Sequence, residues 1–354
     1  MSVRPLARLR PGVAAGFLAA VEEELTSFLL RQREELAAAA SEAARLVDEL
    51  LGLSRAGGKR LRPLFCYWGF RAGGGEDEEA LARVGAALEL VHLAALVHDD
   101  LLDRSRLRRG RPTVHRRLGA EGRPGAALAV LVGDLAQAMA DHLFLQAAFP
   151  PDRLLAAHAR FALMRQQAVA GELLDLLAEG RGEGEVGEEE ARRVARLKSA
   201  SYSVVGPLLV GATLAEASPS VLEVLARYGW PLGEAFQLRD DVLGTFGDPR
   251  VTGKDRDTDV REGKRTVLVV KALAAAGPEG RAVLRAHLGR EDATREVVER
   301  VRGVLRESGA LSATLELIGS LSRQAKGALS GAGLRAEVVE ALDHLADLVA
   351  LRDA

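Results

Sequence analysis

The sequence predicts an all-α protein that folds as one large domain over its 354 residues. Nearly every segment places apolar residues three or four positions apart, which is the period of an amphipathic helix. Only 4% of the residues are aromatic, so the core must consist mainly of Leu, Ala and Val, which suits helices better than sheets. The alternating runs that indicate β-strands do not occur in the sequence. A single domain over residues 1–354 is therefore expected, with a motif-bearing core at about 50–275.

The first predicted helix is Val13–Leu30, where Phe17, Val21 and Leu25 recur four positions apart with charged residues between them. The same spacing predicts further helices over Leu81–Leu102, Leu128–Phe144, Leu154–Leu177, Ala191–Ala215, Val221–Leu243 and Thr266–Ala276. Glycine and proline cluster between these segments, so loops are expected there. The loops are placed at Ala72–Gly75, Gly119–Gly125, Phe149–Pro151, Gly180–Gly187, Ser218–Pro219 and Gly277–Pro278.

Charge and cysteine content exclude several classes of protein. The chain has 48 Lys and Arg against 50 Asp and Glu, a net charge of −2, which argues against a nucleic-acid partner or a polybasic membrane anchor. The single cysteine, Cys66, excludes internal disulfides. The charge-free apolar stretch Ser199–Ala215 is too short to span a bilayer. A cytoplasmic protein without stable membrane insertion or a secretory signal is expected.

Two acidic clusters each end an apolar predicted helix. Asp99 and Asp103 are four positions apart, so on a helix their carboxylates lie about one turn apart on one face. Asp240 and Asp241 end a second apolar helix about 140 positions later. Asp99 considered by itself is typical of a solvated helix end, with its carboxylate paired to a nearby arginine. Two such clusters that face each other, however, could hold divalent ions, and carboxylate oxygens completed by water and phosphate suit Mg²⁺.

Basic side chains follow the acidic clusters along the chain. Each basic segment alone is typical of a solvated loop, but an Mg²⁺ site on helix ends needs an anionic ligand to complete it. Together they suggest a cavity for two polyphosphate-bearing molecules. The basic segments are Gly58–Arg62, Arg108–Arg111, Lys198, Lys254 and Gly263–Arg265.

With these segments in order, the chain resembles the trans-isoprenyl diphosphate synthases of the polyprenyl synthetase family. The similarity runs from about Leu50 to Ala275 and rests on seven ordered motifs, whereas one Asp-rich motif alone would be weak. They are Gly57-Gly58-Lys59-Arg60-Leu61-Arg62-Pro63; Asp99-Asp100-Leu101-Leu102-Asp103 with Arg108-Arg109-Gly110-Arg111-Pro112-Thr113; Gly133-Asp134; Gly171-Glu172-Leu173-Leu174-Asp175; Lys198-Ser199; Phe236-Gln237-Leu238-Arg239-Asp240-Asp241; and Gly263-Lys264-Arg265-Thr266.

The resemblance implies a homodimer of helical bundles, each around a deep central cavity, and a role for each motif. Asp99, Asp103 and Asp240 would hold three Mg²⁺ ions that clamp the diphosphate of an allylic substrate. That diphosphate would also be bound by Arg108, Lys198, Ser199 and Lys264, with Gln237 and Lys254 nearby. The second substrate, isopentenyl diphosphate, would lie against Lys59, Arg62, His92 and Arg109. The implied reaction joins the two substrates into a linear trans-prenyl diphosphate.

The chain departs from the family pattern at three places. Gly244 stands where the second acidic motif usually ends in aspartate, Glu172 stands where glutamine is common, and Lys254–Asp259 is unusually charged. Two other classes of protein fit these motifs less well. A terpene cyclase would share one Asp-rich motif but would have no use for a second basic pocket. An inactive regulatory subunit would be expected to lose an acidic motif, and this chain keeps both.

Product length is predicted from the residues before Asp99. In the family the growing tail runs beside this helix, and bulky side chains about one turn before the first aspartate stop it. Here those positions are Ala94 and Ala95, too small to stop a fifteen-carbon chain, with Val91 in the next layer and Met139 or Leu143 facing it. Alternatively, the two alanines only let helices pack closely. The expected product is twenty-carbon geranylgeranyl diphosphate, with longer polyprenyl or farnesyl products as alternatives.

Overall fold

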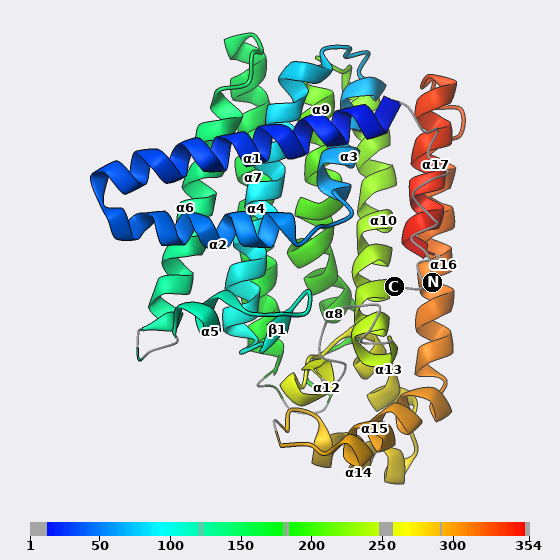
Figure 1. Cartoon of the computed structure of the whole chain (residues 1–354). Helices are drawn as coiled ribbons and strands as arrows, with labels where there is room; N and C mark the ends of the chain where they lie inside the picture. The colour runs from blue at the N-terminus through cyan, green and yellow to red at the C-terminus, as the bar shows by residue number, and fades with distance from the viewer. Residues whose placement is uncertain are drawn as a thin grey trace. The chain divides into compact units, whose positions relative to one another are not determined.

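The computed structural model describes residues 13–119, 122, 124–179, 181, 184–247, 258–290 and 292–350. Helices dominate throughout these ranges (Figure 1), which confirms the predicted all-α class. The contacts divide the chain into two compact units. Unit 1 is Met1–Phe161 with Pro207–Leu222, and unit 2 is Ala162–Gly206 with Glu223–Ala354. A single domain over the whole chain stays a prediction.

Unit 1 is built around two long apolar helices, α4 and α6, which pack along each other. Asp77 caps α4 by accepting a hydrogen bond from the Ala80 amide at 3.1 Å, which satisfies one of the free amides of the first turn. Helix α1 crosses α3 and α4 (Figure 1). The elements up to α6 are α1 (Val13–Ala39), the 3₁₀ helix η2 (Ser41–Ala43), α2 (Ala44–Arg55), α3 (Leu61–Ala72), α4 (Glu78–Leu102), β1 (Leu107–Arg108), β2 (Arg111–Pro112), α5 (Val114–Leu118) and α6 (Gly125–Leu145).

Unit 2 holds most of the helices that follow α6, whereas α9 from Pro207 on and the first residues of α7 and α10 belong to unit 1. Within unit 2, α16 lies beside both α13 and α17. Thr266 and Thr294 cap α13 and α15 through their hydroxyl oxygens. The elements that follow α6 in the chain are α7 (Pro151–Glu179), α8 (Glu188–Ala195), η4 (Arg196–Val205), α9 (Gly206–Leu214), α10 (Pro219–Phe246), α12 (Thr258–Glu262), α13 (Val267–Ala275), α14 (Pro278–His287), α15 (Arg295–Glu307), α16 (Ala310–Leu329) and α17 (Ala336–Ala350).

Two expectations about secondary structure are wrong. The predicted helix Ala191–Ala215 is interrupted, because η4 is a π-helix between α8 and α9. Apolar spacing cannot reveal this change, since η4 remains helical and buried. A small antiparallel hairpin pairs Leu107 with Pro112 and Arg108 with Arg111, although no strand was expected. Each of its strands has two residues, too few to show an alternating pattern.

Each unit has its own buried apolar side chains. In unit 1, Phe17 packs against Tyr67, and Phe144 against Phe161, with ring centroids 4.9 and 4.7 Å apart. In unit 2, the cluster formed by α13, α14 and α15 includes Leu268, Leu284 and Val301. These side chains are mainly aliphatic, as the low aromatic content predicted.

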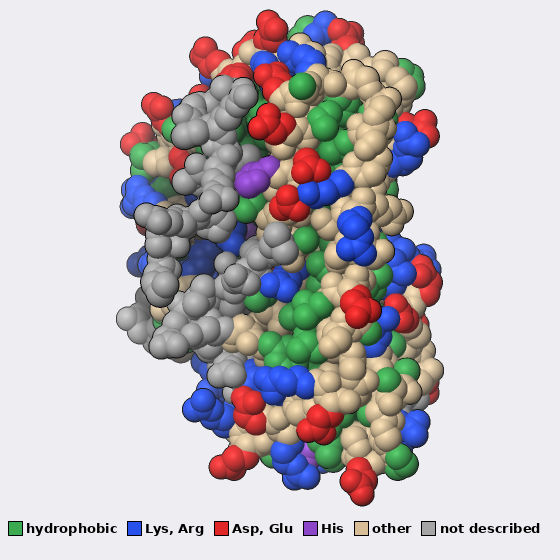
Figure 2. Space-filling view, turned by 90° about the vertical axis from the view of Figure 1, so that its right-hand side faces the viewer, with side chains coloured by type: hydrophobic (Ala, Val, Ile, Leu, Met, Phe, Trp, Pro, Cys, Tyr) green, Lys and Arg blue, Asp and Glu red, His purple; other side chains and the backbone are tan. Residues whose placement is uncertain are grey.

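By length and composition alone, α4 and α6 could each cross a membrane. The most apolar window of α4 is 78% buried inside the protein, which is typical of a core helix, whereas that of α6 is 44% buried. Both helices contain charged residues, so neither is a charge-free stretch of the sequence. Figure 2 shows acidic and basic side chains interspersed over the described part of one face, in keeping with the net charge of −2.

Candidate active site

The acidic end of α4 is tied to the hairpin by one arginine. Arg108 donates from Nε to Asp100 Oδ1 at 2.8 Å and from Nη2 to Asp99 Oδ2 at 3.0 Å. Both Asp100 and Arg108 are buried, whereas the side chain of Asp99 is 26% exposed. Burial alone would lower the pKa of Arg108, but Asp100 and Asp99 offset this and the pKa is raised. The pair of Asp100 and Arg108 is therefore the fixed part of this site.

The hairpin presents Arg108 and Arg109 because of its turn. Arg109 and Gly110 both have positive φ, 52° and 73°, as a two-residue type I′ turn requires. Thr113 closes the hairpin by donating from its hydroxyl to the Ser105 carbonyl at 2.9 Å. The turn therefore places the hairpin, with both arginines, beside the C-terminal end of α4.

Three guanidinium groups bind the C-terminal carbonyls of α2. Arg111 donates to Gly52 O at 3.1 Å and Arg109 donates to Leu53 O at 3.0 Å. Arg60 donates to the next carbonyl, Ser54 O, at 2.9 Å. Carbonyls at the C-terminal end of a helix carry the negative end of the helix dipole, so cations are favoured there. The result is a basic cluster in unit 1.

Arg60 differs from the other cations of its motif because it is structural. It is 5% exposed, and its Nη1 donates to the buried Glu89 at 2.7 Å while its Nε donates to Glu22 at 2.7 Å. Its neighbour Gly58 leaves space for this arrangement, since a Cβ there would lie 3.3 Å from Arg60 Nη1 and 3.2 Å from Arg109 Nη2. Sequence reasoning did not identify the two glutamates, because neither belongs to a motif.

His92 lies among these arginines. Burial and the charges of Arg62 and Arg109 hold its pKa well below the usual value for histidine, so its ring is neutral at pH 7. Arg62 is 8% exposed on α3, and Lys59 is exposed in the loop before that helix. The structure thus brings Arg62, His92 and Arg109 together as one positively charged region.

One face of α4 is partly accessible on the N-terminal side of the acidic end. His92, Ala95 and Asp99 are all partly exposed, and their spacing of three and four places them on the same side of the helix. Ala94 is fully buried and Val91 is 3% exposed, so the two alanines differ in environment. Ala95 is therefore the alanine on the same face as Asp99.

Gly133 of α6 makes room for the histidine that precedes Asp99. A Cβ at Gly133 would come within 2.0 Å of His98 Nε2. His98 in turn lies 3.4 Å from Val130 O and 3.7 Å from Asp134 Oδ1. The Gly133-Asp134 motif therefore packs against the end of α4.

In unit 2, Lys198 is held by two carboxylates of α7. Its Nζ lies 2.8 Å from Glu172 Oε2 and 2.7 Å from Asp175 Oδ2. Ser199, the next residue, is 5% exposed. The glutamate that departs from the family pattern is thus a direct partner of the predicted diphosphate-binding lysine.

The second acidic motif, Asp240 and Asp241, lies close to other carboxylates. Gln237 Nε2 donates to Asp241 Oδ1 at 2.7 Å. Burial, followed by the charges of Asp259, Asp175 and Asp240, raises the pKa of Asp241 to about 8. Gly244, where the family often has an aspartate, lies so near Asp259 that a Cβ would meet its Oδ2 at 2.0 Å. Asp259 therefore occupies the space next to the missing aspartate, which sequence reasoning did not foresee.

Lys264 is the remaining basic residue predicted for the allylic diphosphate. Its Nζ lies 3.0 Å from Glu262 Oε2, and its amide donates to Asp259 O at 3.3 Å. Lys254 lies outside the described residues. In the described ranges, no three His, Cys, Asp or Glu side chains are already arranged as a metal site. The crowding around Asp241 is nevertheless the electrostatic situation that a bound cation relieves.

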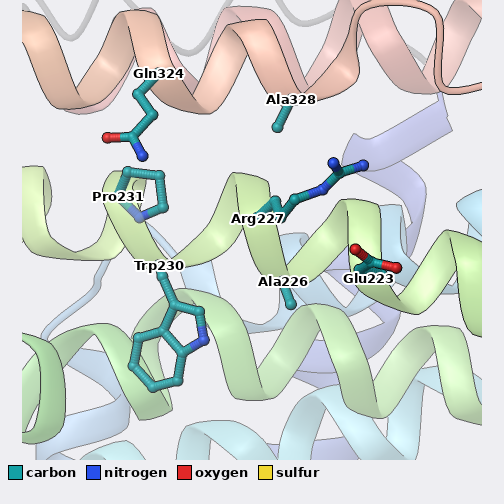
Figure 3. A pocket seen from close by; sticks show the side chains of 7 residues that line it. All are labelled: Glu223, Ala226, Arg227, Trp230, Pro231, Gln324 and Ala328. Atoms are coloured by element: carbon teal, nitrogen blue, oxygen red, sulfur yellow. The ribbon is translucent and has the colours of Figure 1, made fainter.

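One pocket of about 420 Å³ in unit 2 lies away from these residues. It opens between α10 and α16, with Pro231 opposite Gln324 and Arg227 beside it (Figure 3). None of its lining side chains is a predicted site residue. It is therefore not the candidate active site.

Fold and site define the chain as an all-α enzyme whose two units carry the paired acidic and basic motifs of a diphosphate transferase. The polyprenyl synthetase profile matches residues 44–305, and the chain belongs to that family. It is a prenyltransferase of the trans-prenyl diphosphate synthase type.

Named relatives make products of different length. Geranylgeranyl diphosphate synthase of Saccharolobus solfataricus is 35% identical over 257 residues, which cover 72% of this chain and 74% of that protein. Nonaprenyl diphosphate synthase of Mycobacterium tuberculosis is 33% identical over 321 residues, 90% of this chain and 86% of that protein. Among solved structures, geranylgeranyl pyrophosphate synthase of Corynebacterium glutamicum, complexed with isoprenyl diphosphate and magnesium, has a TM-score of 0.90 and 34% identity, and the match covers 95% of this chain and 98% of that one.

Proposed function

We propose that this prenyltransferase condenses isopentenyl diphosphate with an allylic diphosphate to make geranylgeranyl diphosphate. The observation that carries the chain length is Ala95, which lies on the same partly accessible face of α4 as Asp99. A methyl group there leaves room for a tail that runs along α4 from Asp99. One helical turn advances about 5.4 Å, roughly one isoprene unit, so a small residue one turn from the first aspartate permits a tail beyond fifteen carbons.

A divalent metal fits the acidic residues of both units. The raised pKa of Asp241 reflects its burial and then the nearby carboxylates of unit 2. Asp99 and Asp103 are carboxylates at a partly exposed helix end in unit 1. Asp99, Asp103 and Asp240 would be the ligands of Mg²⁺, with three ions when the allylic substrate is bound. The metal supplies charge neutralisation for the leaving diphosphate.

The basic residues divide between the two substrates. Isopentenyl diphosphate would be bound by Lys59, Arg62, His92 and Arg109. Arg62 and Arg109 lie near a neutral His92, which supports an anion-binding site in which the imidazole ring donates or accepts a hydrogen bond. Arg108, Lys198, Ser199, Gln237, Lys254 and Lys264 would bind the allylic diphosphate. They stabilise the charge that develops as its C–O bond breaks.

The remaining steps need few groups. The allylic carbocation must be kept from water, and apolar Leu, Ala and Val side chains around it would exclude water. The double bond of isopentenyl diphosphate attacks this cation, and the proton that is then lost goes to the departing diphosphate. His92, whose ring is neutral, orients isopentenyl diphosphate by hydrogen bonding instead of acting as a cationic acid.

A homodimer in the cytoplasm is part of the proposal. Helix α6 carries Val130 and Leu131 with 42% and 52% of their area exposed, although its composition is strongly apolar. An apolar helix left half exposed is typical of a subunit interface. A second copy of the chain would cover this face.

A longer polyprenyl product is the second candidate, because the nonaprenyl synthase of Mycobacterium tuberculosis covers 90% of this chain at 33% identity. Incubation of the purified protein with Mg²⁺, labelled isopentenyl diphosphate and each allylic primer, followed by sizing of the products, tests both. A main product of twenty carbons supports the proposal. A main product of fifteen carbons, or of more than twenty-five, contradicts the chain length, and no elongation of any primer contradicts the proposed reaction.

A further inference from the structure

The segment that carries Lys198 and Ser199 is the π-helix η4, in unit 2. π-helices close i→i+5 hydrogen bonds, are rare, and occur often at functional sites. The amide of Gly206 at the end of η4 donates to the carbonyl of Ser201, five residues earlier. The backbone of η4 is therefore wider than that of the α-helices on either side of it and needs extra space from its neighbours.

Glycines on two neighbouring helices provide that space. At Gly171 of α7, a Cβ would lie 2.1 Å from the Lys198 amide nitrogen and 2.5 Å from Lys198 Cα. At Gly233 of α10, a Cβ would lie 2.4 Å from Ala200 Cβ and 2.6 Å from Ala200 Cα. The crowded atoms are backbone or Cβ atoms, which cannot rotate aside. The shortest distances, 2.1 Å at Gly171 and 2.4 Å at Gly233, both fall at least 1 Å short of an ordinary contact at 3.4 Å, so an added methyl group must displace η4.

Other contacts hold η4 in this position. Next to Gly233, the buried Glu234 forms an ion pair with Arg192 of α8 and lies 3.7 Å from Arg196 Nη1 at the start of η4. The Ser201 hydroxyl donates to Leu197 O at 2.6 Å within the segment. Glu234 therefore links α10 to the start of η4, whereas the Ser201 hydrogen bond stabilises η4 internally.

One region of α7 faces both the backbone and the side-chain ammonium group of Lys198. Gly171 contacts its backbone, while Glu172 and Asp175 bind its ammonium group at 2.8 and 2.7 Å. We propose that Gly171 and Gly233 are positioning residues that set the place of Lys198 by admitting the wide backbone of η4. This rests on the proposed function, in which Lys198 binds the allylic diphosphate. A shift of about 1 Å in such a group costs about 10²-fold in rate.

The test is a double-mutant cycle with Gly171→Ala and Lys198→Ala, together with Gly233→Ala. Gly327→Ala is the matched control, because Gly327 lies inside helix α16 with nothing within 4 Å of its Cβ position. Two quantities are measured for each variant: steady-state kinetics with each substrate varied, and calorimetric binding of geranyl diphosphate with Mg²⁺. Far-UV circular dichroism and Tm show that each variant is folded.

Gly171→Ala and Gly233→Ala should each lower kcat/KM for the allylic substrate about 10²-fold. The KM for isopentenyl diphosphate should stay within about threefold of the parent, and Gly327→Ala should match the parent in both assays. In the Lys198→Ala background, Gly171→Ala should lower activity and binding by less than about threefold. The reason is that the effects of two substitutions that act through one group are not additive.

The inference is overturned if Gly171→Ala and Gly233→Ala behave like Gly327→Ala. It is also overturned if the loss from Gly171→Ala is the same with and without Lys198, which would indicate general damage. If Gly171→Ala does not fold, Gly233→Ala combined with Lys198→Ala decides by the same criterion. A parent that binds geranyl diphosphate but elongates nothing contradicts the proposed function, while the binding cycle still decides the role of the glycines. A parent that binds no allylic diphosphate overturns both.

Discussion

Arg108 donates a hydrogen bond from Nη2 to Asp99 Oδ2 at 3.0 Å, so a predicted diphosphate-binding cation already contacts a predicted metal ligand. The same guanidinium is fixed by the buried Asp100 through Nε at 2.8 Å. Asp99 is partly exposed whereas Asp100 is buried. Adjacent aspartates of one motif thus have different tasks: Asp100 holds Arg108, while Asp99 is accessible to a ligand.

The first prediction concerns Asp99 and Asp103. Asp99→Ala or Asp103→Ala should lower turnover at least about 10³-fold, because about 4 kcal/mol of charge stabilisation is lost from the transition state. Tm should change little, since each variant removes one of several neighbouring carboxylates. Steady-state kinetics and thermal denaturation measure both effects. Turnover within tenfold of the parent for either variant would show that it is not a metal ligand.

The second prediction concerns Asp100. Asp100→Ala should destabilise the protein by about 3–5 kcal/mol, because it removes the buried partner of a buried guanidinium. Chemical denaturation at pH 7 measures this change. The exposed Asp292→Ala serves as the control and should leave stability within about 0.5 kcal/mol. A loss below about 1 kcal/mol for Asp100→Ala would mean that Asp99 alone is enough to hold Arg108.

The third prediction is a pH dependence from His92. Burial and the charges of Arg62 and Arg109 lower its pKa in the folded state, so below about pH 6.5 the unfolded chain binds a proton that the folded chain does not. Stability contributed by the neutral ring is therefore lost as the pH falls below about 6.5. In His92→Gln, Tm should fall less between pH 7 and 5.5 than in the parent. Equal falls in both proteins would show that His92 is protonated in the folded state.

The fourth prediction concerns Asp241, whose pKa is raised to about 8 by burial and by Asp259, Asp175 and Asp240. The folded state therefore holds a proton that the unfolded state releases near pH 4, and stability falls as the pH rises from there to about 8. With divalent ions chelated, Asp241→Asn should raise Tm at pH 8.5 and have little effect at pH 5. Asp292→Asn should change neither value. A lower Tm for Asp241→Asn at pH 8.5 would contradict this.

The sequence predicted helices well where their apolar face is regular, as in α4 and α10. It did not predict η4, because the π-helix depends on the space left by Gly171 and Gly233, which are distant in sequence. The hairpin of Arg108 was missed because its strands are too short to show a period. The π-helix thus depends on contacts between separate elements, which a one-dimensional pattern does not contain, whereas the hairpin is local but too short for a pattern to show.

The site was predicted unevenly for the same reason. The motifs pointed to Asp99, Lys198 and Asp240, and the resemblance gave each a role. Arg60 stands in the same motif as Lys59 and Arg62, yet it is buried against Glu89. Only the fold shows which cation of a basic run points into the core.

The most direct test of the account is the product of Ala95→Phe, assayed with Mg²⁺, labelled isopentenyl diphosphate and geranyl diphosphate. Ala95 is partly exposed on the face of α4 that also bears Asp99, whereas Ala94 is fully buried, so a ring at 95 should block the tail and a ring at 94 should mainly destabilise the packing. The parent should make twenty-carbon diphosphate, and Ala95→Phe should make fifteen carbons or fewer. An identical product distribution from the two proteins would show that the growing chain does not pass Ala95.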